Sequence, residues 1–395
     1  MANQILWVCP GDAASPWILS GITKEICASL KKRKALAGTF NSNECVFLKD
    51  FHPGKWRSQI HRVVAKFRKP ARRFESEYDE RFRRIIDSFD QKPSVVYQFV
   101  TPVLDPKLDI ERYRFVDISL LDAVRTGAYG FKGLSGAAYQ EAYAEQLRMY
   151  KDCDGIITLS TYAADSISRD FGVPRNLITP IGAASTITES NKPDFGIDRY
   201  ASSRILFVGR DWERKGGPLL LEAFRLVRSR IPKATLCIVG PEISPCNEPG
   251  VIYVPPIDKG RASGRKKIEQ LFISSSVFCM PTRCDTWGLV FTEACAFGTP
   301  IVGLNEWAIP DIVSHDSSGI IVQGETASAL ADGLIMTLED PQRLRNMGIA
   351  ARDRLQNVLD WSHVTDRICF RTGAWGEKSP CNPVWLSRNE QCYQE

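Results

Sequence analysis

Residues that could bind a phosphorylated sugar lie close together in the second half of the chain. Asp285 and Glu293 are eight positions apart, and Gly288 follows the first of them by three positions. A loop ending at Gly288 would open a helix over residues 289–296, whose free backbone N–H groups are a ready site for an anion. Glu293 would lie on the helix face that looks back towards this loop. A loop that can hold phosphate, beside a carboxylate that can accept from sugar hydroxyls, is what a nucleotide-sugar site requires.

A purely structural interpretation of the same segment stays open. It is a helix N-terminus with an acid in its first turn and a small-residue packing face at residues 296–300. Short motifs of this kind also occur by chance, so the segment needs support from elsewhere in the chain.

A second cluster follows the apolar run 204–208, which has the pattern of a buried strand. Gly209 at the end of this run would let another backbone or a ligand come close. Arg210 and Lys215, five residues apart, could converge on a diphosphate, the first through its planar fork and the second as a point charge. The alternative is an exposed basic loop that is only solvated.

Both clusters resemble motifs of the retaining family-4 glycosyltransferases, the glycosyl transferases group 1. Residues 206–240 are similar to the family's strand, Arg/Lys loop, helix and following strand, in the same order and spacing. Asp285 and Glu293 resemble its pair of glutamates, with aspartate in the first position. Residues 307–313 and 318–322 are similar to the family's closing section.

The resemblance implies a role for each matching residue. The arginine and the lysine would bind the donor diphosphate, the loop amides and the first acid would hold the donor sugar, and the second acid would bind the ribose. The implied donor site comprises Gly209, Arg210, Lys215, Gly240, Pro241, Asp285, Thr286, Trp287, Gly288, Leu289 and Glu293. The implied catalytic groups are Arg210, Lys215, Asp285 and Asp117. The nucleotide-diphosphate sugar would be a co-substrate with no other cofactor and no metal, because cations and amides would stabilise the leaving group.

Two positions depart from the family's pattern. Asp285 is one methylene shorter than the usual glutamate, and Trp287 replaces the more usual phenylalanine. These differences would shift the donor preference, or would mark a relative that binds a donor without transferring it.

The start of the first helix is a candidate acceptor-side site. Ser20 and Gly21 stand where many relatives have two glycines, which implies backbone amides near the diphosphate and the acceptor. An ordinary N-cap serine in front of a helix over residues 21–30 is the alternative.

Two further first-half residues are candidates. Asp117 would take the place of the family's first-domain histidine, and Tyr129, in a loop rich in glycine and aromatic residues, would suit sugar stacking. A helix cap at Asp117 and a packed pair of Tyr129 and Phe131 are the structural alternative.

Short apolar runs alternate with helical patterns along the chain, which predicts an α/β fold of parallel sheets covered by helices. The resemblance implies the GT-B arrangement, two doubly wound Rossmann-like domains facing a central cleft. The expected parts are an acceptor-side domain (1–183), a hinge (184–202), a donor-binding domain (203–365) and a C-terminal tail or strap (366–395). Strands are expected at 5–8, 94–100, 155–160, 204–208, 235–239, 251–254, 277–280, 300–302 and 320–322.

The composition, with 44% hydrophobic and 25% charged residues in 395, is that of a soluble globular protein. No run approaches the ~20 apolar residues of a membrane span and the start lacks a signal-peptide pattern, so we expect a cytoplasmic protein. The 12 cysteines are scattered singly, which suggests neither a zinc site nor a disulfide framework. A net charge of +5 does not by itself indicate nucleic acid as a partner.

Residues 54–74 form a local basic stretch with interleaved apolar residues at helical spacing. Such a stretch fits peripheral contact with an anionic membrane surface, an acidic acceptor, or a solvated face of a first-domain helix.

The function expected from the resemblance is retaining transfer of a sugar from a nucleotide-diphosphate sugar to a hydroxyl acceptor. The acceptor could be a polysaccharide, a glycolipid or a small molecule. The alternatives are a non-catalytic subunit that binds a nucleotide sugar or acts as a scaffold, and a nucleotide-sugar 2-epimerase. The epimerase shares the fold but lacks the combination of an Arg/Lys loop with paired acids.

Overall fold

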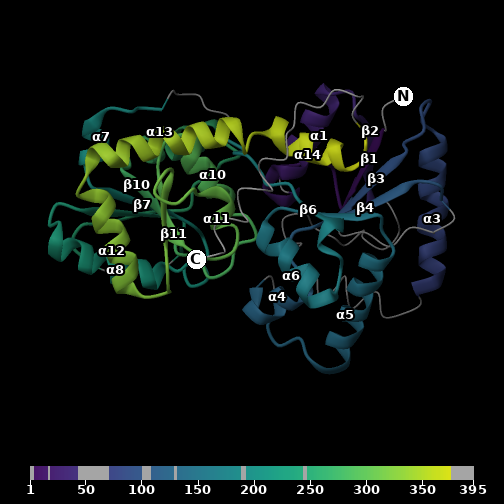
Figure 1. The fold of residues 1–395 in the computed structure, drawn as a ribbon, viewed down its shortest axis with the longest axis horizontal. Coiled ribbons are helices and arrows are strands. Elements are labelled where there is room, and N and C mark those ends of the chain that lie inside the picture. The colour runs from purple at the N-terminus through teal and green to yellow at the C-terminus, as the bar shows by residue number, and fades with distance from the viewer. Residues whose placement is uncertain are drawn as a thin grey trace. The chain divides into compact units, whose positions relative to one another are not determined.

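The computed structural model describes residues 4–16, 18–42, 71–99 (71–78 for the backbone only), 108–128, 131–187, 193–242 and 247–374. These residues form two units, each built on a six-stranded sheet (Figure 1). The first unit runs to Ile181 and is completed by the segment from Trp361, and the second is Gly182–Asp360. Every strand pairing in both sheets is parallel, which confirms the predicted α/β class.

The first unit has the strand order β2-β1-β3-β4-β5-β6. Its strands are β1 (Ile5–Cys9), β2 (Leu36–Asn41), β3 (Val95–Phe99), β4 (Glu111–Val116), β5 (Gly155–Thr158) and β6 (Ile178–Pro180). Its helices are α1 (Ile22–Lys32), α3 (Ala71–Asp87), α4 (Leu120–Thr126), α5 (Gly136–Lys151), α6 (Thr161–Phe171) and α14 (Trp361–Arg371), with short 3-10 turns at Ile18–Gly21 and Arg175–Leu177.

Helix α14 belongs to the first unit because it packs on that unit's helix α1 and sheet. Ser29 and Thr365 share a hydrogen bond of 2.8 Å, and Arg33 forms an ion pair of 2.6 Å with Asp366. The Tyr97 hydroxyl, on a central strand, donates to the Ile368 carbonyl at 3.4 Å. The expected end of the donor-binding domain at residue 365 therefore falls inside α14.

The second unit has the strand order β12-β11-β10-β7-β8-β9. Its strands are β7 (Arg204–Val208), β8 (Thr235–Val239), β9 (Val251–Val254), β10 (Val277–Cys279), β11 (Ile301–Leu304) and β12 (Gly319–Val322). Its helices are α7 (Ile197–Ala201), α8 (Gly217–Arg230), α9 (Ala262–Ile273), α10 (Leu289–Ala296), α11 (Ile309–Ile312), α12 (Ala327–Leu338) and α13 (Pro341–Asn357).

All nine predicted strands are present, with ends shifted by one or two residues at some of them. Strands β2, β4 and β6 were not predicted. The reason is clearest for β4, which carries Glu111, Arg112 and Arg114 and so lacks an apolar run. The structure nevertheless buries Arg114 to 1% exposure within this central strand. Residues 54–70 of the predicted basic stretch lie outside the described residues. The same holds for residues 375–395 of the predicted tail.

A buried arginine anchors the carboxyl ends of two helices in the second unit. Arg199 is 6% exposed and donates to the carbonyls of Phe272 (3.0 Å), Ser275 (3.0 Å) and Phe297 (2.9 Å). These carbonyls lie at the ends of α9 and α10, where unpaired acceptors and the negative end of the helix dipole favour a cation. Burial lowers the pKa of Arg199 from its ordinary value, but the carbonyl acceptors stabilise its charged form.

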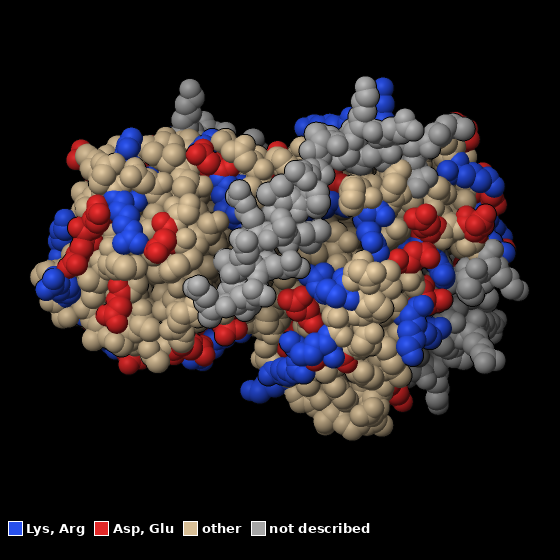
Figure 2. Space-filling model, in the orientation of Figure 1, with Lys and Arg blue, Asp and Glu red and all other residues tan. Residues whose placement is uncertain are grey.

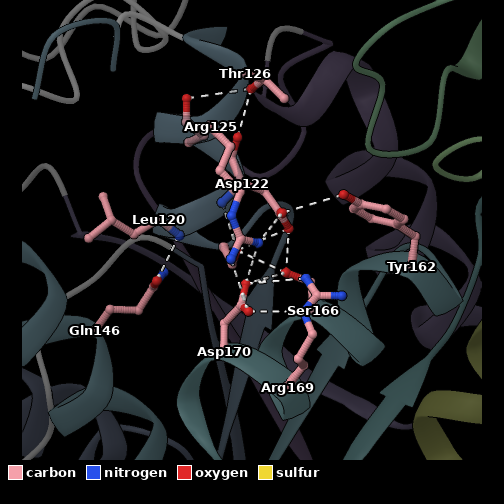
Figure 3. Close-up of polar contacts among 11 residues, drawn as sticks. Leu120, Asp122, Arg125, Thr126, Gln146, Tyr162, Ser166, Arg169 and Asp170 are labelled. Carbon is pink, nitrogen blue, oxygen red and sulfur yellow. Dashed lines mark hydrogen bonds and ion pairs between the residues drawn. The ribbon is translucent and has the colours of Figure 1, made fainter.

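A polar network in the first unit joins α4 to α6 (Figure 3). Asp122, 1% exposed, accepts from the hydroxyls of Ser119 (3.0 Å) and Ser166. Asp170 pairs with two exposed guanidinium groups, Arg125 at 2.7 Å and Arg169 at 2.9 Å. Acidic and basic side chains are likewise intermingled on the face of the molecule in Figure 2.

Replacing Arg199 with Met should lower the free energy of unfolding by about 3 kcal/mol or more, because several buried carbonyls lose a charged donor. Urea unfolding of the full chain measures the loss. Arg204→Met is the control, since the Arg204 side chain makes an exposed hydrogen bond of 3.2 Å to Ser274. Similar losses for the two variants would contradict an anchoring role for Arg199.

Asp170→Asn should destabilise the protein by about 1 kcal/mol at neutral pH, with a loss that shrinks under acid. Burial raises the pKa of Asp170, but hydrogen bonds from Arg169 and Arg125 outweigh it, and the net pKa is lowered. The ionised group therefore stabilises the fold above the unfolded pKa of about 3.9, and this stability is lost as the pH falls through the folded pKa.

Unfolding of both chains between pH 7 and pH 3 measures this dependence. Asp165→Asn on the same helix is the control, because the pair of Asp165 with Arg175 is exposed on both sides. A difference between Asp170→Asn and the parent that stays constant down to pH 3 would count against the ion-pair explanation.

Candidate functional site

The candidate donor site of the second unit lies at the carboxyl ends of β7 and β10. These strands are neighbours in the sheet, and the chain leaves β7 towards β8 on one side and reaches β10 on the other. Ligands of open α/β sheets bind outside the carboxyl ends of the strands at such a switch point. The predicted residues from Gly209 to Lys215 follow β7, and those from Asp285 to Glu293 follow β10. The topology therefore brings the two sequence clusters to one edge of the sheet.

Two glycines let the loops after β7 and β8 approach each other. Gly240 has φ +101°, and a Cβ atom there would lie 3.2 Å from the Gly209 carbonyl oxygen. The Gly209 N–H donates to the Val239 carbonyl at 2.9 Å. Pro241, the next predicted donor residue, is buried beside them. These glycines let the backbones of the two loops come close together.

Backbone contacts join the loop after β7 to the loop after β10. Gly216 has φ +73°, and a Cβ atom there would come within 1.8 Å of the Pro281 carbonyl oxygen. The Arg283 N–H donates to the Arg214 carbonyl at 2.9 Å, and the Arg214 guanidinium donates to the Cys284 carbonyl at 2.6 Å. Arg214 was not predicted as a site residue, because its contact partners lie about 70 positions further along the chain.

Helix α10 has the bounds that the sequence predicted, Leu289–Ala296, and begins after Gly288. Its N-cap, Gly288, has no side chain to cap the helix, and the Phe291 N–H donates to the Gly288 carbonyl at 2.9 Å. The N–H groups of Leu289 and Val290 are therefore the ones that could bind an anion. Glu293 lies on this helix and is 2% exposed. Asp285 and Thr286, in the loop before the helix, are 8% and 5% exposed.

Each predicted acid of the site forms an ion pair with a lysine. Lys215 is hydrogen-bonded to Asp285, and the side chains are 13% and 11% exposed. Lys259 Nζ lies 2.5 Å from Glu293 Oε2. The first pair joins two residues that the sequence predicted for the site. Lys259 was missed, because it lies in a polar loop with no motif around it.

The remaining predicted side chains differ in what they could offer to a ligand. Arg210 is exposed, and within the described part of the chain it makes no hydrogen bond or ion pair. Trp287 is 1% exposed and donates through Nε1 to the Ala183 carbonyl at 2.9 Å. The indole of Trp287 therefore fixes the position of the loop and presents no ring face to a ligand. Leu289 is partly buried at the first position of α10.

Neither Ser20 nor Asp117, two candidate residues of the first unit, caps a helix as the structural alternative predicted. Ser20 has φ +56° and is exposed, and Gly21 is the N-cap of α1, so the N-cap serine interpretation is wrong. Asp117 is 6% exposed after β4, but Ser119 caps α4 by accepting from the Asp122 N–H at 3.2 Å. The helix cap expected at Asp117 is therefore two residues further on. Tyr129 lies outside the described residues.

The described residues contain no group of three or more His, Cys, Asp or Glu side chains that could hold a metal ion. None of the helices described combines the length and the apolar character that a membrane crossing requires.

Gly216→Ala should destabilise the second unit by about 2 kcal/mol or more, because it combines a left-handed backbone with a collision against the Pro281 carbonyl. Gly324→Ala is the matched control, since Gly324 has φ +83° with nothing within 4 Å of its added Cβ atom. It should cost only the backbone term of about 1 kcal/mol. Chemical denaturation measures both variants, and equal losses would show that the approach to Pro281 imposes no constraint.

Known proteins resemble the chain in both sequence and fold. Residues 202–340 match the model of the family described as glycosyl transferases group 1. The glycogen synthase of Mycobacterium tuberculosis is 25% identical over 73% of this chain and 71% of its own length. The D-inositol 3-phosphate glycosyltransferase of Pseudarthrobacter chlorophenolicus is 30% identical over 43% of this chain and 42% of its own.

Two solved structures resemble the chain over both of its units. Sucrose-phosphate synthase from Thermosynechococcus elongatus has a TM-score of 0.62 and 15% identity, with 99% of each chain covered. The Anabaena protein HepE, solved with UDP and glucose, has a TM-score of 0.55 and 14% identity, and covers 94% of this chain and 100% of its own. These likenesses establish the fold, and the range matched by the family model includes both residue clusters of the second unit. The chain therefore has a GT-B type fold, and its residues 202–340 match the family of glycosyl transferases group 1.

Proposed function

We propose that the chain is a retaining glycosyltransferase that moves a sugar from a nucleoside diphosphate sugar to a hydroxyl acceptor without a metal ion. The observation that carries this proposal is the convergence of Lys215, Asp285 and the uncapped start of α10 after neighbouring strands. Cation, carboxylate and free N–H groups are the three chemistries that a diphosphate-linked sugar needs. Exposed Arg210 adds a second cation on the same loop as Lys215.

The proposed chemistry is stabilisation of charge on a leaving diphosphate. As the bond between the sugar and the diphosphate breaks, negative charge grows on the phosphate oxygens. Arg210, Lys215 and the N–H groups at the start of α10 would stabilise that charge, a term that often dominates catalysis of this type. With cations and amides in these positions, a metal ion is not required for the leaving group.

Binding of the donor would exchange the partners of the charged groups. Lys215 would move its ammonium from Asp285 to the diphosphate, and Asp285 would accept from hydroxyls of the donor sugar. Glu293 would accept from the ribose hydroxyls, as the resemblance implies. The exchange gives the Lys215 ammonium an anionic partner before and after binding, which limits the cost of desolvating it.

For retention without a covalent intermediate, the acceptor hydroxyl would attack from the face that the diphosphate leaves, and its proton would pass to the departing diphosphate. The two acids of the second unit are assigned to holding the donor, and neither is proposed as a nucleophile. We propose a cytoplasmic enzyme whose acceptor is a polysaccharide, a glycolipid or a small molecule. UDP-glucose is the first donor to test, because HepE was solved with UDP and glucose.

Arg210→Ala and Lys215→Ala should each lower kcat about 100-fold or more, and the double variant should show no turnover, because each removes a charge from the leaving group. Donor hydrolysis over UDP-, GDP- and ADP-sugars provides the assay, with NMR of the first product for anomeric configuration. Arg225→Ala is the control on the following helix, since Arg225 pairs with Glu248. Unchanged rates in the site variants would refute the assignment.

The thermal stability of the full chain in the presence of the same donors distinguishes the other functions. A donor that stabilises the folded chain but is never hydrolysed or transferred would indicate a binding or scaffold subunit. Conversion of a nucleotide sugar to its 2-epimer would indicate an epimerase.

A further inference from the structure

The buried carboxylate of Glu293 is paired with one lysine, Lys259. Glu293 is 2% exposed, and its carboxylate accepts a hydrogen bond from the Lys259 ammonium. Over the described ranges, this is the single hydrogen bond or ion pair of the Glu293 side chain. The Lys259 side chain is 38% exposed, so the lysine approaches the buried carboxylate from the solvent side.

A single ammonium leaves much of the carboxylate's acceptor capacity unused. An ionised carboxylate has about four lone-pair sites on its two oxygens. Lys259 contacts Oε2 of Glu293. The pair offsets the cost of burying the charge, and the second oxygen keeps lone pairs that a further donor could use. Two neighbouring hydroxyls of a ribose would supply such donors.

The loop that carries Lys259 is held in place by its own contacts. The Gly260 N–H donates to Asp258 Oδ1 at 2.9 Å. Arg265, on the first turns of α9, donates to the carbonyls of Lys259 (3.1 Å) and Gly260 (2.9 Å). The backbone around Lys259 is therefore fixed against the helix that follows it, and the lysine is aimed at α10 by the fold.

We propose that Lys259 is a positioning residue of the donor site, which offsets the charge of Glu293 and orients its free oxygen towards the ribose diol of the bound nucleoside diphosphate. This inference rests on the proposed function and deepens it. It assigns recognition of the ribose to a pair of residues from two elements, of which the family motif supplies one. Lys259 acts through Glu293 and makes no contact with the phosphates.

Calorimetric titration of the full chain tests this role with three probes. UDP, GDP and ADP are compared first, and the tightest binder is used with its 2′-deoxy form and with inorganic pyrophosphate. Lys259→Ala should weaken binding of the nucleoside diphosphate about 10-fold or more, the range expected for hydrogen bonds to a charged group. Binding of pyrophosphate should stay within about 2-fold, and the 2′-deoxy form should lose less than the ribose form. Lys266→Ala, an exposed lysine on α9, is the matched control and should change none of the three.

A second set of variants separates positioning from a general structural effect. Lys259→Arg should recover most of the affinity, because it restores the cation beside Glu293. In a Glu293→Gln background, Lys259→Ala should cause little further loss, because its partner charge has been removed. In transfer assays, Lys259→Ala should raise KM for the donor and leave kcat within about 2-fold.

Three results would overturn the proposal. Equal losses for pyrophosphate and the nucleoside diphosphate would mean that Lys259 contacts the phosphates. Additive effects of the Lys259 and Glu293 substitutions would mean that the residues act separately. Failure of Lys259→Arg to recover any affinity, in a chain that unfolds at the parent temperature, would exclude a role for the charge. If the parent chain itself binds no nucleoside diphosphate, the proposed function fails first and this inference fails with it.

Discussion

The buried guanidinium of Arg199 is the interaction on which the geometry of the candidate donor site depends. Arg199 donates hydrogen bonds to the carbonyls of Phe272 and Phe297, which lie at the carboxyl ends of α9 and α10. The amino end of each of these helices lies next to a residue of the candidate site. The loop with Lys259 comes directly before α9, and Gly288 opens α10. Because a helix is stiff over 8 to 12 residues, fixing the two carboxyl ends fixes where the amino ends lie.

Arginine suits this anchoring role, and lysine suits an ion pair whose cation could change its partner when a donor binds, as proposed above. The planar fork of Arg199 donates in several fixed directions at once, and it also contacts Thr299 at 2.6 Å. A lysine ammonium is a point charge on a flexible stem, so Lys215 and Lys259 can each hold one carboxylate and still move. The second unit therefore has the rigid cation at the helix ends and the flexible cations where the proposed donor would bind.

The elements of the second unit could be predicted from sequence because their signals are local. Strands β7, β8 and β9 and helix α10 have the predicted bounds, since each is a short apolar run ended by glycine, proline or polar residues. The first unit was less predictable. Its strand β4 contains charged residues, and burial of Arg114 is a tertiary effect that no local pattern reports. The consecutive left-handed residues Ser20 and Gly21 were equally invisible, since serine usually favours a helix cap.

In the candidate site, too, some residues could be predicted from local sequence, and others depend on contacts between distant parts of the chain. The types and spacing of Asp285 and Glu293 indicated an acid pair on a loop and its helix, and the structure has them there. Their lysine partners lie 70 and 34 positions away in the chain, in loops whose meeting depends on strand order. The motifs therefore supplied both acids and Lys215, but the pairing of the lysines with the acids, and Lys259 itself, come from the topology. For this reason Lys259 could be recognised only after β9, α9 and α10 had been placed in one unit.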